Sequence, residues 1–143
     1  MSPKKNILVS NTGHSLLCDF GLSRIRHELS LTSATIRQGG NNRFIAPEIS
    51  PEKDDIRVNE QSDIYSLAMT IYALGTKSPP FKDVKPHHAR RMAAKGDRPS
   101  KHDSLGGLTL EHTDLLWSLL ERMWNQDPQL RPTVSDARDE IVA

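Results

Sequence analysis

The sequence predicts a mainly α-helical fold, in which a short β-hairpin and a long loop precede about four helices. Two short apolar runs separated by a turn signal predict the hairpin in residues 7–18. Apolar residues at helical spacing predict the helices in the second half of the chain. Between these parts, residues 21–43 keep no regular period and are rich in Ser, Thr, Arg, Gly and Asn. A segment of this length without regular structure is usually a functional loop or a disordered one.

The hairpin is predicted from two apolar runs and the polar residues between them. The runs are Ile7-Leu8-Val9 and Ser15-Leu16-Leu17-Cys18, and Asn11-Thr12-Gly13-His14 lies between them. Asn and Gly tolerate a positive φ, which favours a turn at this place. Because a lone two-stranded hairpin is only marginally stable in water, it must pack on another part of the chain.

The first predicted helix carries apolar side chains at the spacing i, i+3, i+4, i+7 and i+8, followed by two more apolar residues. A helix with this pattern should be buried on most of its sides. Gly75 is expected to end it, because glycine is favoured where a helix stops. The repeat consists of Ile64, Leu67, Ala68, Ile71 and Tyr72, and Ala73 and Leu74 follow it.

A second, shorter helix is predicted after a break at residues 78–81, which contain two prolines. It runs from about Pro86 to Lys95, because proline is favoured in the first turn of a helix. Gly96 is expected to stop it.

Two more helices are predicted toward the end of the chain. An amphipathic one runs from about Leu110 to Asn125, and the last one starts near Thr133. The Thr133 hydroxyl can cap free amides of the first turn, and Asp136, three residues on, completes a capping pair. The predicted apolar face of the longer helix contains Leu116, Leu119, Leu120, Met123 and Trp124.

Charge and composition exclude several classes of protein. The net charge is +1, so no strong field favours nucleic acid or an anionic membrane, and neither partner is expected. A basic cluster is interpreted as a solvated surface, since such runs usually lie on exposed faces. The single cysteine suits a reducing compartment, and the lack of a long apolar run agrees with a cytoplasmic location. The basic cluster contains Arg90, Arg91, Lys95, Arg98 and Lys101.

Three short motifs follow one another along the chain. Asn6 directly precedes the first apolar run, and Asp19-Phe20-Gly21 directly follows the second. Ala46-Pro47-Glu48 comes after the long loop. In this order and spacing, the chain resembles the protein kinase family, whose catalytic-loop Asn, DFG motif and APE motif these residues match. The resemblance covers essentially all of residues 1–143 and leans toward the tyrosine-kinase-like group.

Two later segments extend the resemblance. Residues 62–67 look like the start of the family's central buried helix, and residues 124–133 look like the segment before its last helix. The resemblance therefore implies a partial kinase domain over residues 1–143. This would be the C-terminal lobe of the kinase fold, with the long loop as its activation segment and with the N-terminal lobe absent.

The resemblance implies a magnesium-ATP site that transfers phosphate to a protein substrate. Mg²⁺ neutralises charge on the transferred phosphate and prefers oxygen ligands. Asn6 would supply a carbonyl oxygen and Asp19 a carboxylate, so both are candidate metal and nucleotide ligands. Phe20 would fix the direction of Asp19 by packing, and Gly21 would let the backbone turn.

Structural roles also follow from the resemblance. Glu48 and Arg131 match the family's buried ion pair, which anchors the activation segment at the motif that Ala46 and Pro47 share with Glu48. Asp63 would brace the backbone of the catalytic loop by hydrogen bonds. Read one at a time, these charged residues could each be ordinary surface groups, and their order along the chain favours the kinase interpretation.

Several groups that the family needs for catalysis are not among the 143 residues. The glycine-rich loop, the strand lysine and the helix glutamate of the N-terminal lobe have no counterpart here. The position of the catalytic aspartate, five residues before Asn6, is Met1, whose thioether cannot accept a substrate proton. No catalytic residue is therefore assigned, and the chain alone is expected to be inactive.

Three interpretations remain open from the sequence. The chain is a fragment of an active kinase for Ser/Thr or Tyr, or a non-catalytic lobe that acts as an interaction module or decoy, or a relic without a stable fold. Low stability is expected, because the family's helices that cover the central helix would be missing. Apolar surface would then be exposed at Ile64, Leu67, Ile71 and Leu74.

Overall fold

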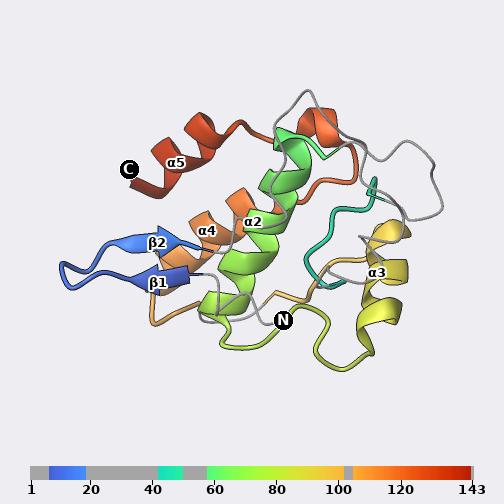
Figure 1. Ribbon diagram of the computed structural model, residues 1–143, viewed down its shortest axis with the longest axis horizontal. Helices are drawn as coiled ribbons and strands as arrows, with labels where there is room; N and C mark the ends of the chain where they lie inside the picture. Colours follow the sequence, from blue (N-terminus) through green and yellow to red (C-terminus); the bar gives the residue numbers. More distant parts are fainter. Residues whose placement is uncertain (1–6, 19–41, 50–57, 102–104, 143) are drawn as a thin grey trace.

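The computed structural model describes residues 7–18, 42–49, 58–101 and 105–142, and these residues confirm the predicted fold class. A two-stranded hairpin precedes four α-helices and one short 3₁₀ helix in this part of the chain (Figure 1). The elements are β1 (Ile7–Val9), β2 (Ser15–Leu17), α2 (Glu60–Gly75), α3 (Pro86–Ala94), α4 (Leu110–Met123), η3 (Pro128–Leu130) and α5 (Val134–Val142).

The hairpin forms where the sequence predicts it. β1 and β2 pair antiparallel, and Ile7 lies opposite Leu17. Gly13 has φ +84°, a left-handed conformation that glycine adopts without steric cost, so the turn closes tightly. The register places the start of β1 and the end of β2 side by side.

Helix α2 begins with a complete capping box. The Asn59 Oδ1 accepts a hydrogen bond from the Ser62 amide at 2.9 Å, and the Ser62 Oγ accepts one from the Asn59 amide at 3.0 Å. Both contacts satisfy amides that the first turn of a helix leaves without an intrahelical partner.

Asn59→Ala is expected to lower the free energy of unfolding by about 1 kcal/mol, because it removes this acceptor. Asn59→Asp is the matched control, since it keeps an oxygen acceptor at the same place. Urea denaturation of the three proteins measures the difference. An alanine variant with the wild-type midpoint would contradict the role given to this cap.

The burial of α2 follows the predicted repeat only in part. Ile64 and Ala68 are buried, with 1% and 0% of their surface exposed. Leu67 and Leu74 keep 41% and 46% of their surfaces exposed, which confirms the exposure expected at these two residues and limits the prediction of a helix buried on most sides. The exposure expected at Ile64 is wrong, because this residue lies in the main cluster of buried side chains.

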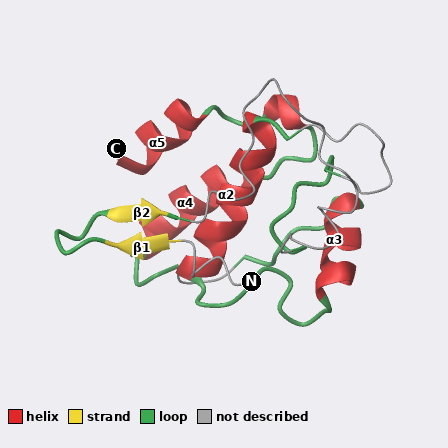
Figure 2. Ribbon diagram, in the orientation of Figure 1, coloured by secondary structure: helices red, strands yellow, loops and turns green. Residues whose placement is uncertain are grey.

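The main core lies between α2 and α4, which pack directly on each other (Figure 2). Four residues of the predicted apolar face are buried, and Leu116 is half-buried. Trp117 is also buried and was not part of the predicted face. It packs edge-on to Trp124, with ring centroids 5.4 Å apart, and to Tyr72 at 6.4 Å. The buried residues of the predicted face are Leu119, Leu120, Met123 and Trp124.

The ends of the last helices agree closely with their sequence signals. α4 ends at Met123, and Trp124 is its C-cap, so the helix is slightly shorter than predicted. The predicted capping pair forms at α5, where the Thr133 amide donates to Asp136 and the Asp136 amide donates to Thr133. Within the described residues, no helix combines the length and the apolar character that crossing a membrane would require.

Candidate functional site

The segment 42–49, which contains the Ala46-Pro47-Glu48 motif, lies in the core of the molecule. Phe44, Ala46 and Ile49 are all buried and belong to the main cluster of buried side chains. The Ser66 hydroxyl of α2 donates a hydrogen bond to the Phe44 carbonyl at 2.8 Å. Pro47 is half-buried beside them. The segment is therefore held against α2 by apolar packing and by a side-chain contact to its backbone.

Glu48 and Arg131 lie together although they are far apart in the sequence. The Arg131 Nη1 donates to the Glu48 Oε1 at 2.6 Å, and the Nη2 donates to the Oε2 at 2.9 Å. In this bidentate geometry, the planar guanidinium faces the planar carboxylate and forms two parallel hydrogen bonds with it. The Arg131 side chain is completely buried, whereas 22% of the Glu48 side chain is exposed.

Two backbone carbonyls complete the surroundings of Arg131. The Nε donates to the Asn125 carbonyl at 2.9 Å, and the Nη1 also donates to the Gln61 carbonyl at 2.8 Å. Because each nitrogen of the guanidinium donates to at least one acceptor, the charge is compensated despite its complete burial. The contacts link the segment 42–49, the start of α2 and the turn after α4 at one point.

Local backbone contacts explain why Arg131 points inward. The Asn125 Oδ1 accepts a hydrogen bond from the Asp127 amide at 2.9 Å, and the Asp127 Oδ1 accepts one from the Gln129 amide at 2.9 Å. These side chains cap the start of η3, whose C-cap is Arg131. Asn and Asp favour such turns because their side chains bond to the backbone two residues on.

Tyr65 lies between two arginines beside this ion pair. The Arg131 guanidinium carbon is 5.2 Å from the centre of the Tyr65 ring, and that of Arg98 is 5.3 Å from it. Cations at this distance from an aromatic face are attracted by its quadrupole. Burial raises the pKa of Tyr65 to about 12, so the ring stays neutral between the two charges.

Arg98 corrects the interpretation of the basic cluster. It was expected on a solvated surface, but its Nε donates to the Trp124 carbonyl at 2.7 Å and its Nη2 donates to Gln126 at 2.7 Å. Arg90 likewise donates to the Ile49 carbonyl. The exposed members Arg91 and Lys95 agree with the expectation. No periodicity marks Arg98, because it lies in a loop, so its role was not visible in the sequence.

Asp63 is exposed in the first turn of α2, and none of the described residues forms a hydrogen bond to its carboxylate. The catalytic-loop backbone that is expected to form hydrogen bonds with Asp63 belongs to residues 1–6, which lie outside the described part of the chain. Partial burial raises the pKa of Asp63, and the negative charge of Glu60 raises it further.

The raised pKa of Asp63 predicts the effect of removing its charge. A carboxyl group that holds its proton more tightly in the folded state lowers stability once both states are ionised, at neutral pH. Asp63→Asn is therefore expected to raise the urea midpoint at pH 7 and to leave it unchanged at about pH 3, where both states are protonated. A lower midpoint at pH 7 would show that the carboxylate stabilises the fold.

The remaining candidate residues lie outside the described residues. These are the proposed metal ligands Asn6 and Asp19, together with Phe20 and Gly21. The described strands nevertheless lead to both ligands, because Asn6 precedes β1 and Asp19 follows β2 after Cys18. Among the described residues, no group of three His, Cys, Asp or Glu side chains could hold a metal ion.

The comparisons with known proteins identify the class. A model of the protein kinase domain matches residues 4–141, so the chain belongs to the protein kinase family. The chain is 32% identical over 133 residues to receptor-interacting serine/threonine-protein kinase 2 from Bos taurus, which covers 90% of this chain and 25% of that protein. The tyrosine-kinase-like leaning is consistent with this relative.

Two further relatives are also kinases by name. Serine/threonine-protein kinase TNNI3K from Mus musculus is 34% identical over 132 residues, which are 92% of this chain and 15% of that protein. Dual specificity protein kinase shkC from Dictyostelium discoideum is 28% identical over 143 residues, which are 96% of this chain and 26% of that protein. The chain thus spans no more than 26% of the length of these three relatives.

Proposed function

We propose that residues 1–143 form the C-terminal part of a protein kinase domain that uses ATP and Mg²⁺ to phosphorylate Ser, Thr or Tyr on a protein substrate. The observation that carries this proposal is the Glu48–Arg131 pair, which fixes the Ala46-Pro47-Glu48 motif in the core. The activation segment implied by the kinase resemblance would end at this fixed motif. It could then be ordered beside a protein substrate while its end stays attached to the helices. We also propose a cytoplasmic location, which the single cysteine favours.

Two residues would hold the metal in this proposal. Asn6 offers an amide carbonyl and Asp19 a carboxylate, and these hard oxygen donors fit Mg²⁺. The antiparallel register supports their proximity, because the strand ends next to them lie opposite each other at Ile7 and Leu17. When bound, Mg²⁺ supplies positive charge to the transferred phosphate.

The other residues of the motifs orient these ligands. Phe20 would restrict the direction of Asp19 by packing, and Gly21 would allow the backbone to turn. In the complete kinase domain, Asp63 would accept hydrogen bonds from backbone amides of the catalytic loop.

The 143-residue chain alone is expected to transfer no phosphate. It holds no glycine-rich loop or strand lysine for the nucleotide, and Met1 stands in the position of the catalytic aspartate. Incubation of the pure chain with Mg-ATP and a general protein substrate tests this, with an active kinase as positive control. Phosphate incorporation above that of heat-denatured chain would refute the expectation.

One observation favours a non-catalytic alternative, an interaction module or decoy. Leu67 and Leu74, seven residues apart in α2, expose 41% and 46% of their surfaces, and a partner that covered both would bury this apolar surface. Calorimetry and sedimentation of the pure chain test this alternative. A sharp melt of a monomer would favour the module, whereas aggregation without a cooperative melt would favour a fragment that needs the rest of its domain.

A further inference from the structure

Helix α3 stands apart from the main core. Its buried side chains are Ala89 and Ala93, and neither belongs to the cluster of buried side chains that α2, α4 and the segment 42–49 share. In Figure 1 the segment 42–49 runs between α2 and α3. Because two methyl groups bury little apolar surface, apolar packing alone holds α3 weakly.

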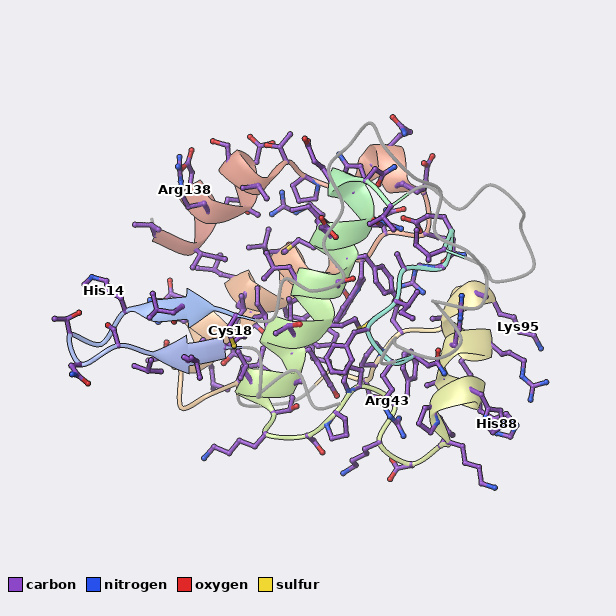
Figure 3. All side chains as sticks on the ribbon, viewed as in Figure 1. His14, Cys18, Arg43, His88, Lys95 and Arg138 are labelled. Carbon is purple, nitrogen blue, oxygen red and sulfur yellow. The ribbon has the colours of Figure 1, made fainter. Side chains whose placement is uncertain are left out.

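Arg43 supplies a polar attachment from the segment 42–49 to residues 76–85, the linker between α2 and α3. Its Nη1 donates to the Pro80 carbonyl at 2.9 Å and to the Phe81 carbonyl, and its Nη2 donates to the Val84 carbonyl. Figure 3 shows Arg43 beside this linker, with His88 projecting from the outer side of α3 and Lys95 directly after the end of the helix.

The linker backbone adopts an uncommon conformation where Arg43 contacts it. Phe81 has φ 52°, a left-handed conformation that non-glycine residues rarely adopt. Such a conformation persists only where the surroundings hold it. The Arg43 guanidinium donates hydrogen bonds to three carbonyls of this turn. The Phe81 ring packs against the main core.

Arg90 supplies an attachment in the opposite direction. It belongs to α3, and its Nη2 donates to the carbonyl of Ile49, the residue after Glu48. One arginine therefore reaches from the segment to the linker of α3, and another reaches from α3 back to the segment. Hydrogen bonds from a charged donor are stronger than those between neutral groups.

We propose that Arg43 and Arg90 are positioning residues that couple α3 to the segment 42–49, so that the two open and close as one unit. The coupling itself does not depend on kinase activity. Under the proposed function, a displacement of α3 would also shift the Ala46-Pro47-Glu48 motif, because these contacts join the two. By reciprocity, a ligand that holds the motif in place would also hold α3.

Amide hydrogen exchange on the full 143-residue chain tests the coupling, because exchange reports local opening of each element. Arg90→Met is expected to speed exchange about tenfold or more at the Ile49 amide, although the substitution is in α3. Arg43→Met is expected to speed exchange of the α3 amides by a similar factor. The α4 amides should keep their wild-type rates in both variants.

Matched controls separate coupling from general damage. Arg91→Met changes the neighbouring, exposed arginine of the same helix and should leave all rates unchanged. Arg90→Lys and Arg43→Lys keep one charged donor each, so their rates should lie between wild type and the Met variants. If the Met variants are unfolded throughout, the exchange rates of the Lys variants in α3 and at Ile49 test the coupling instead. Faster exchange confined to the substituted element, or equal acceleration in α4, would overturn the proposal.

Discussion

Arg131→Met is expected to lower the free energy of unfolding by about 3–5 kcal/mol, the usual cost of removing one partner of a buried ion pair. The substitution leaves the Glu48 carboxylate without its cation and leaves two backbone carbonyls, those of Asn125 and Gln61, without a donor. Urea denaturation followed by circular dichroism measures the loss. A loss this large is a substantial part of the stability of a typical domain, about 5–15 kcal/mol.

Glu48→Gln is the informative control for this prediction. It removes the negative charge, but Arg131 keeps its bonds to the two carbonyls, and the amide oxygen remains an acceptor. We expect a smaller loss of about 1–3 kcal/mol. If Glu48→Gln costs as much as Arg131→Met, the carboxylate, and not the network around the arginine, dominates the stability of this site.

Leu120→Ala is expected to lower the free energy of unfolding by about 2–5 kcal/mol, because it leaves a cavity in a tightly packed core. Leu120 has 0% of its surface exposed and lies where α4 packs on α2. Leu115→Ala makes the same chemical change in the same helix at a residue that is 65% exposed. It should change stability by less than about 0.5 kcal/mol.

The two alanine variants together test where the core lies. Thermal or urea unfolding of both gives the comparison directly. Similar losses from the two substitutions would mean that α4 does not bury the face described here. A minimal effect of Leu120→Ala with a cooperative transition would contradict the core between α2 and α4.

Local signals in the sequence predicted the helices and their ends well. Thr133 and Asp136 are three residues apart, so the capping pair at α5 was visible without any knowledge of the fold. The burial of Trp117 could not be predicted in the same way. The apolar face predicted for α4 was narrower than the face that α2 covers, and Tyr72 of α2 packs on Trp117. Which part of an amphipathic face becomes buried depends on its neighbours.

Long-range contacts of charged side chains were the least predictable part of the site. Arg90 and Arg98 lie in a basic cluster that looks like a solvated surface, and composition cannot show that their acceptors are the carbonyls of Ile49 and Trp124. Main-chain acceptors carry no side-chain signal. Glu48 and Arg131 were predicted as partners only because the order of the motifs resembles that of a family.

The most direct test of the account is phosphate transfer by the protein that the complete transcript encodes, measured with and without Asp19→Asn. Asp114→Asn is the matched control, because it makes the same change at an exposed residue of α4. The account predicts Mg²⁺-dependent transfer that falls to background in Asp19→Asn and persists in Asp114→Asn. Transfer that survives Asp19→Asn would contradict the assignment of the metal ligand, and no transfer by the unsubstituted protein would contradict the catalytic interpretation itself.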